Sequence, residues 1–187
     1  MAPIELFFDR GTILLKNLPT TLQKTFFQLQ WDGRILSYRA PANKYYDIAL
    51  YLHKEGIPFL DNAKQFEHTR LRLSRRITPR NYQQEALDHW IQAGKRGVVT
   101  LPTGAGKTML AMLCITKTSR PTLVHVPTID LMQQWHGLLE QFFGVRVGRV
   151  GGGYKEWEQL TVSTYDSAIL QVEYYGNQYG LLIFDEC

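Results

Sequence analysis

The pattern of hydrophobic and polar residues changes partway along the chain. In the C-terminal part, continuous apolar runs predict strands over 98–101, 122–126, 145–150, 160–163 and 181–184. Between most of these runs, apolar residues recur at helical spacing and predict helices over 81–93, 108–117, 129–143 and 165–172. Fully apolar strands that alternate with helices are typical of a parallel sheet covered on both faces. We therefore expect an α/β domain over residues 81–187.

Residues 1–70 show a different arrangement of shorter elements. The pattern predicts strands over 4–8, 12–15 and 35–38 and a helix between 41 and 56. Asp9-Arg10-Gly11 separates the first two strands, as expected of a β-hairpin, and Trp31-Asp32-Gly33-Arg34 forms a second turn signal. Strands and one helix in a stretch of this length predict a small α+β domain. Residues 71–80 would then link it to the α/β domain.

Positive charge is concentrated before the α/β domain. The whole chain carries a net charge of +4, but residues 1–80 hold 13 Lys+Arg against seven Asp+Glu. The excess is greatest at Arg70, Arg72, Arg75, Arg76 and Arg80. An arginine cluster can neutralise DNA phosphates and release their counterions, so it is a candidate nucleic-acid contact. The alternative is a solvated linker that happens to be basic.

Cysteine content and hydropathy indicate the compartment. The only cysteines, Cys114 and Cys187, cannot form a disulfide framework, which favours a reducing cytoplasm. No apolar run approaches the roughly 18–20 residues of a membrane span. The first residues also lack the layout of a signal peptide. We expect a cytoplasmic, nucleoid-associated protein from a prokaryote, with no membrane partner.

One segment has the chemistry of a phosphate-binding loop. Residues 101–108 follow a predicted strand and open a predicted helix, and the loop itself comprises Thr103, Gly104, Ala105, Gly106, Lys107 and Thr108. Glycines let backbone N–H groups surround phosphates at a helix N-terminus. Lys107 would reach the β- and γ-phosphates of ATP, and the Thr108 hydroxyl would bind Mg²⁺. Leu101 stands where the general pattern starts with glycine, and a chance Gly-Lys-Thr turn is the alternative.

Hydrolysis of ATP also needs carboxylates, one for the metal and one for the attacking water. Asp185 and Glu186 follow the apolar run 181–184, and Asp185 lies 78 residues beyond Lys107. Neighbouring carboxylates at a strand end point in different directions. We assign Asp185 to Mg²⁺ and Glu186 to the water, so that Lys107, Asp185 and Glu186 form the predicted catalytic set.

These motifs and four further segments resemble superfamily 2 helicases, and more narrowly the XPB (xeroderma pigmentosum group B) DNA-repair helicases. Residues 101–108 resemble helicase motif I, and Asp185-Glu186-Cys187 resembles the start of a DECH-type motif II. The other segments, in the family's order, are Arg80-Asn81-Tyr82-Gln83, the stretch from Val126-Pro127-Thr128 to Trp135, Gly151-Gly152-Gly153, and residues 161–168. In the N-terminal part, Asp9-Arg10-Gly11-Thr12, Trp31-Asp32 and Tyr38-Arg39-Ala40-Pro41 are similar to the small damage-recognition domain of prokaryotic members.

The resemblance implies a RecA-like first helicase lobe, incomplete at Cys187, preceded by a damage-recognition-like domain. It also implies that Arg80 and Gln83 contact adenine. DNA contacts are implied at Pro127, Thr128, Gly151, Gly152 and Thr164, with Arg72, Arg75 and Arg76 added on charge.

Each of these residues has a simpler structural alternative. Gln83 could be a polar residue on a helix, and Tyr82 is expected in the core. Thr128 could act only as a helix N-cap, and the glycine turn could be merely mobile. Trp31 and Trp157 could stack on bases, but we expect both to be core residues.

The resemblance implies an ATP-dependent DNA helicase or translocase of the nucleotide-excision-repair type, moving 3′ to 5′. The chain would be its N-terminal part and inactive as a motor by itself, because a second lobe supplies the arginine fingers. Distorted duplex or a single-strand junction would be its DNA partner. The alternatives are a phage-type recombination helicase, an RNA helicase, or a non-motor module that acts as a scaffold for a repair nuclease.

Overall fold

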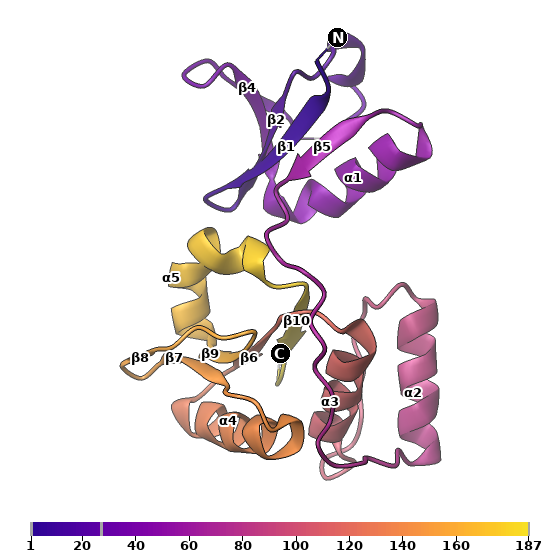
Figure 1. The fold of residues 1–187 in the computed structure, drawn as a ribbon, viewed down its shortest axis with the longest axis vertical. Helices are drawn as coiled ribbons and strands as arrows, with labels where there is room; N and C mark the ends of the chain where they lie inside the picture. Colours follow the sequence, from indigo (N-terminus) through magenta and orange to yellow (C-terminus); the bar gives the residue numbers. More distant parts are fainter. Residues whose placement is uncertain (1, 27, 187) are drawn as a thin grey trace. The chain divides into compact units, whose positions relative to one another are not determined.

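The chain folds as two compact units (Figure 1). The computed structural model describes residues 2–26 and 28–186, so Cys187, the third residue of the expected DECH-type motif, lies outside the described residues. Unit 1 comprises residues 1–66 and 169–178, and unit 2 comprises residues 67–168 and 179–187. A short segment from the C-terminal part of the sequence thus belongs to unit 1, which the sequence pattern does not indicate.

Unit 1 is built on a mixed sheet with the strand order β3-β4-β2-β1-β5. The strands are β1 (Ile4–Asp9), β2 (Thr12–Lys16), β3 (Gln30–Asp32), β4 (Ser37–Pro41) and β5 (Phe59–Asn62). Short 3-10 turns η1 (Thr20–Leu22) and η2 (Ala42–Lys44) and the helix α1 (Tyr45–Lys54) complete the main elements. Ile48 and Leu52 of α1 pack with the buried side chains of β1 and β2 in one core. The expected small α+β domain is therefore present.

The predicted β1–β2 hairpin is confirmed, and its turn explains the Arg-Gly pair. Asp9 pairs with Thr12, so the loop contains only two residues, Arg10 and Gly11, with φ of 46° and 76°. Two residues with positive φ are the requirement of a type I′ turn, which matches the twist of the strands. The Thr12 hydroxyl also donates to the Asp9 carbonyl at 2.6 Å.

Two strands of unit 1 were not predicted, and a third was placed too early. The strand expected over 35–38 begins at Ser37, because Leu36 has a left-handed φ of 50° and is exposed. β3 overlaps the predicted turn, and β5 is short and mostly polar. β5 forms by parallel pairing with β1, a long-range interaction that local pattern does not reveal.

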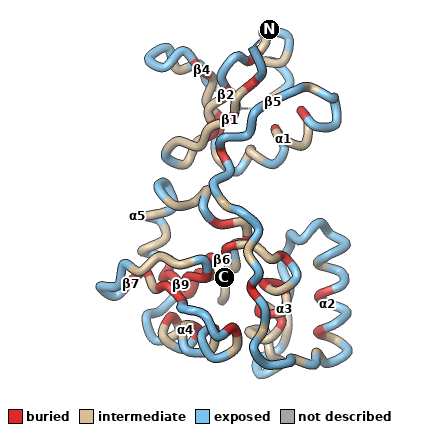
Figure 2. Tube along the Cα trace, viewed as in Figure 1, coloured by how far each residue is buried: buried red, intermediate tan, exposed pale blue. Residues whose placement is uncertain are grey.

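Unit 2 contains the predicted parallel sheet, with the strand order β10-β6-β9-β7-β8. Its strands are β6 (Thr122–Val126), β7 (Gly148–Gly151), β8 (Tyr154–Lys155), β9 (Leu160–Thr164) and β10 (Leu181–Phe184). All pairings are parallel except that of β7 with β8. Every residue of β6 and β9 is buried (Figure 2), as expected of central strands covered on both faces.

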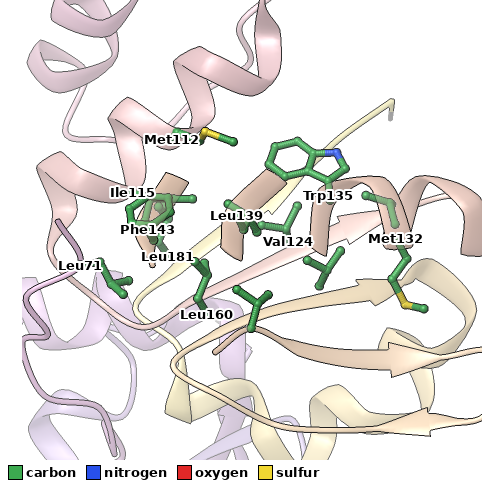
Figure 3. Close-up of a cluster of buried hydrophobic side chains, with 13 residues drawn as sticks. Leu71, Met112, Ile115, Val124, Met132, Trp135, Leu139, Phe143, Leu160 and Leu181 are labelled. Atoms are coloured by element: carbon green, nitrogen blue, oxygen red, sulfur yellow. The ribbon is translucent and has the colours of Figure 1, made fainter. Parts of the chain in front are cut away.

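The helices of unit 2 follow the predicted order: α2 (Asn81–Gln92), α3 (Lys107–Thr118), α4 (Ile129–Phe143) and α5 (Tyr165–Tyr175), which the 3-10 turn η3 (Gly176–Gln178) extends. Helices α3 and α4 pack with the sheet in one core (Figure 3). Helix α5 starts in unit 2, and its residues from Ile169 belong to unit 1. None of the helices in the described part of the chain has the length and apolar character needed to cross a membrane.

The strand predicted over 98–101, directly before the phosphate-binding loop, is wrong for this structure. These residues pair with no strand among the described residues, and Val98 is 86% exposed. A strand requires a neighbour that satisfies its backbone groups, and the sheet ends at β10. The strand predicted over 145–150 also starts later, at Gly148.

The segment expected as a linker, residues 71–80, contributes to the core of unit 2. Leu71 is 3% exposed and packs with Phe143 of α4 and Leu181 of β10 (Figure 3). The Ser74 N–H donates to the Phe142 carbonyl at 2.7 Å. The arginines of this segment are exposed, whereas its apolar residues Leu71, Leu73 and Ile77 pack in or against the core.

Candidate nucleotide site and nucleic-acid track

The phosphate-binding loop has the backbone conformation that its glycines allow. Gly104 and Gly106 have φ of 76° and 80°, and the Ala105 N–H donates to the Pro102 carbonyl at 3.1 Å. Gly106 is the N-cap of α3, so that Lys107 is the first helical residue. Lys107 is exposed, and Thr108 is half-buried beside it. The N-terminus of a twelve-residue helix thus opens onto a glycine loop, which suits an anion.

Gln83 braces this loop from the start of α2. Its Nε2 donates to the carbonyls of Ala105 and Gly106 at 3.0 and 3.2 Å, and its Oε1 accepts from the Arg80 N–H at 2.9 Å. The side chain is 5% exposed. Both amide hydrogens of Gln83 are therefore engaged within the protein, while one lone pair of Oε1 has no donor among the described residues.

Tyr82 and Arg80 belong to the same brace. The Tyr82 hydroxyl donates to the Ala105 carbonyl at 2.9 Å, and Arg80 Nη1 donates to that hydroxyl at 3.2 Å. Tyr82 is half-buried and hydrogen-bonded to the loop, so the expectation that it is a core residue is wrong. The sequence pattern indicated Arg80 and Gln83 for adenine and Tyr82 for the core, and it does not reveal this contact with the loop backbone.

Asp185 is held at the end of β10 by three groups. Its Oδ2 accepts from the indole N–H of Trp135 at 2.8 Å, while its backbone N–H donates to the His125 carbonyl at 2.9 Å. The Tyr165 hydroxyl donates to the Asp185 carbonyl at 2.9 Å. Glu186 follows, exposed and with a left-handed φ of 55°. One carboxylate oxygen of Asp185 is thus fixed and the other is not engaged by Trp135.

Trp135 was not predicted as a site residue, although one general signal was available. It lies in the apolar stripe of α4 and is 2% exposed. A buried indole N–H needs an acceptor, and β10 supplies a carboxylate.

His125, whose carbonyl accepts from the Asp185 N–H, is also buried, at 2% exposure. Its ring packs against those of Tyr165 and Phe184, with centroids 6.2 and 4.9 Å away. Burial lowers the pKa of His125 to about 4, and its Nδ1 has no hydrogen-bond partner among the described residues. His125 is thus a buried residue of β6.

The loop and the carboxylate lie at the same edge of the sheet. Three residues join the end of α3 to the start of β6, so the C-terminal end of α3 is at the amino edge. Helix α3 packs against β10, with Met112 and Ile115 in the same core as Leu181. The opposite end of α3, which bears Lys107, therefore lies at the carboxyl edge, where β10 presents Asp185.

Three of the segments predicted to contact DNA converge at the carboxyl ends of β6, β7 and β9. They contain Pro127 and Thr128, Gly151 and Gly152, and Thr164. Thr164 ends β9, and a Cβ on Gly151 of β7 would lie 2.7 Å from its Oγ1. A Cβ on Gly152 would lie 3.1 Å from Ile129, the first residue of α4. Pro127 and Thr128 are exposed directly after β6. The Thr128 hydroxyl accepts from the Leu131 N–H at 3.2 Å, so Thr128 is the N-cap of α4.

The two tryptophans expected in the core, Trp31 and Trp157, differ in their exposure. Trp31 was expected in the core, but it is 55% exposed, because β3 is an edge strand that places it at the surface. Trp157 is half-buried, with its ring 6.2 Å from that of Tyr179.

Arg72, Arg75 and Arg76 are exposed and form no ion pair within the part of the chain that the structure describes.

Comparison with known proteins identifies both units. The family described as the xeroderma pigmentosum group B helicase damage recognition domain matches residues 6–63. The family described as the type III restriction enzyme, res subunit, matches residues 76–187. The chain belongs to the XPB family of superfamily 2 helicases. The resemblance drawn from the motifs is thereby confirmed.

Among similar XPB proteins, the DNA 3′-5′ translocase XPB2 of Sulfurisphaera tokodaii is 39% identical over 158 residues, covering 84% of this chain and 36% of the relative. The DNA 3′-5′ helicase XPB of Mycobacterium tuberculosis is 32% identical over 118 residues, covering 57% of this chain and 21% of the relative. This chain therefore spans about a third or less of the length of these relatives. The UvsW helicase of bacteriophage T4 superposes with a TM-score of 0.53 at 18% identity, covering 100% of this chain and 83% of that one, and supports the fold.

Proposed function

We propose that this chain carries the nucleotide site of an ATP-driven DNA translocase or helicase of the repair type, moving 3′ to 5′. The observation that carries the proposal is the shared position of the Lys107 loop and Asp185 at one edge of the sheet. In parallel α/β sheets, ligands bind at the carboxyl edge. The relatives from Sulfurisphaera tokodaii and Mycobacterium tuberculosis are named as a DNA translocase and a DNA helicase, both with 3′-5′ direction.

The loop fits the triphosphate of ATP. A Cβ on Gly106 would lie 2.6 Å from Gln83 Nε2, so this close approach of backbone and side chain requires glycine. Lys107 would neutralise the β- and γ-phosphates at the start of α3. Arg80 and the remaining lone pair of Gln83 are the candidate contacts for adenine.

The oxygens of Thr108 and Asp185 fit Mg²⁺, which prefers hydroxyl and carboxylate ligands and keeps several waters. Bound Mg²⁺ would supply charge neutralisation at the β- and γ-phosphates. Trp135 would orient Asp185 by holding Oδ2, leaving Oδ1 directed to the metal shell. Glu186 would order the attacking water and accept its proton.

The DNA strand would run across the carboxyl ends of β6, β7 and β9. Gly151 and Gly152 allow the turn after β7 to lie close to Thr164 and Ile129, and the exposed Thr128 would offer its hydroxyl and backbone N–H group to a phosphate beside this turn. Contacts of this kind position a strand without reading its bases. Arg72, Arg75 and Arg76 would add phosphate contacts that depend on salt.

Calorimetric titration with a non-hydrolysable Mg·ATP analogue tests the proposal. Lys107→Ala should weaken binding by about 10-fold to 100-fold, because it removes a charge-assisted contact with phosphate. Lys117→Ala is the matched control, since Lys117 is exposed at the other end of the same helix. Equal affinities for the two variants would contradict the assignment of the loop.

A further inference from the structure

A hollow of about 440 Å³ opens at the end of the β3–β4 hairpin of unit 1. Its lining residues are Gln30, Trp31, Asp32, Gly33, Arg34 and Arg39. All six belong to unit 1, and none has a role in the nucleotide site proposed above. The hollow therefore needs an explanation of its own.

Trp31 provides a fixed aromatic surface in this hollow. The indole is 55% exposed, and its inner side leans on the Tyr38 ring with centroids 4.9 Å apart and planes at 60°. Gly33 lies against the indole edge, where a Cβ would be 3.6 Å from Nε1. An exposed tryptophan that is held in place by its neighbours offers a preformed stacking surface with little loss of rotamer freedom on binding.

The charges around Trp31 are already balanced. Asp32 accepts from Arg34 Nε at 3.0 Å and Nη2 at 3.1 Å, and also from Arg39 Nε at 3.2 Å. The hydrogen bonds from Arg34, and then those from Arg39, hold the pKa of Asp32 well below its usual range. Arg39 also pairs with Asp9 at 2.8 Å. Two arginines thus face two carboxylates, which leaves little net charge to attract a phosphate.

We propose that this hollow takes an unpaired DNA base that stacks on Trp31. The proposal rests on the proposed function, because it assumes that unit 1 meets DNA. A flat apolar face within a locally neutral set of hydrogen-bonding groups suits a nucleobase better than a phosphate. The Gln30 amide and the Nη1 group of Arg34, a side chain that is 88% exposed, can donate to the edge of the base. Base stacking on aromatic side chains tolerates any base, so the site would recognise loss of pairing rather than sequence.

The test compares two duplexes that differ by a single unpaired base, using the 187-residue chain. Trp31→Ala should weaken binding to the duplex with the unpaired base by about 5-fold to 150-fold and leave the fully paired duplex unaffected. Trp31→Phe should restore most of the affinity, because it keeps an aromatic ring. Tyr46→Ala is the matched control, since Tyr46 is an exposed aromatic residue of unit 1 outside the hollow.

A second measurement changes only the DNA. Replacing the unpaired nucleotide by an abasic one should reduce the affinity of the unaltered protein by a similar factor, and Trp31→Ala should then cause no further loss. Two outcomes would overturn the base site while leaving DNA binding itself intact. In the first, Trp31→Ala weakens binding to the paired duplex and to the duplex with the unpaired base equally. In the second, neither Trp31→Ala nor the abasic nucleotide lowers the affinity. The base site would also be overturned if Trp31 bound a peptide more tightly than the duplex that contains the unpaired base. Failure of the unaltered protein to bind either duplex would count against the proposed function.

Discussion

At the scale of single residues, Gln83 joins two segments that are more than 20 positions apart in the sequence. Its Nε2 donates to the carbonyls of Ala105 and Gly106, and its Oε1 accepts from the Arg80 N–H at the start of its own helix. The glycine loop before α3 is thus held by a side chain outside the loop. Gln83 is a positioning residue for Lys107 as well as a candidate adenine contact.

Removing this brace should destabilise the protein measurably. Gln83→Ala removes the hydrogen bonds from Nε2 to two loop carbonyls and from the Arg80 N–H to Oε1, and hydrogen bonds of this kind contribute about 0.5–1.5 kcal/mol each. Urea denaturation would measure the loss in the free energy of unfolding. Gln84→Ala is the control, because Gln84 is exposed and its side chain bonds only Asp88. Equal stability of both variants would show that the brace contributes nothing.

His125 predicts a pH dependence of stability. Its pKa is lowered to about 4 by burial, whereas the unfolded chain binds the same proton near 6.5. As pH falls below about 6.5, the unfolded state takes up the proton first, so the stability due to neutral His125 declines until about pH 4. The total change is up to about 3 kcal/mol.

The comparison of unfolding at pH 7.5 and pH 5 tests this prediction. His125→Phe, which keeps an aromatic ring without a titratable group, should show a smaller loss between the two pH values. His89→Gln, at an exposed position on α2, should behave like the unaltered protein. A persistent pH dependence in His125→Phe would assign the effect to another group.

At the scale of elements, helix α4 shows how local signals fix a boundary. Thr128 caps its start, and Gly144 ends it in a left-handed conformation with φ of 64°. Thr128→Ala should lower the free energy of unfolding by about 1 kcal/mol, because a capping hydroxyl is lost. Thr128→Ser should retain the cap, and thermal denaturation of both variants measures the difference. If Thr128 also contacts DNA through its backbone, the serine variant should bind DNA normally.

Elements with their own periodicity and caps were predictable, and elements that depend on distant partners were not. Helix α4 and strand β6 have the bounds expected from sequence, because apolar spacing and capping residues define them locally. β5 forms only through its pairing with β1. Residues 98–101 have the composition of a strand, but the described part of the sheet offers them no neighbour.

The same limit applied to the candidate site. Lys107 and Asp185 could be proposed from sequence because each lies in a contiguous motif. Trp135, which bonds Asp185 across 50 positions, was not, because only folding brings α4 beside β10.

At the scale of the whole molecule, the distribution of charge predicts how DNA binding responds to salt. Reversing two of Arg72, Arg75 and Arg76 should reduce the slope of log K against log[salt] by about 1–2, since each lost phosphate contact changes it by about 0.9. The double variant Lys24→Glu with Lys54→Glu changes the net charge equally at exposed positions of unit 1. An equal effect of both double variants on the slope would mean that the arginines act only through total charge.

The sequence by itself determined the family, the α/β class of the larger unit and the residues proposed for the nucleotide site, because motifs and apolar periodicity are local properties. The tertiary structure decided which groups meet. It assigned residues 169–178 to unit 1, where Asn177 Nδ2 donates to the Ala63 carbonyl at 2.9 Å. It also placed Trp31 on an edge strand, with its ring exposed beside balanced charges. These contacts join residues far apart in the chain, and their partners are chosen by packing and by the satisfaction of buried polar groups.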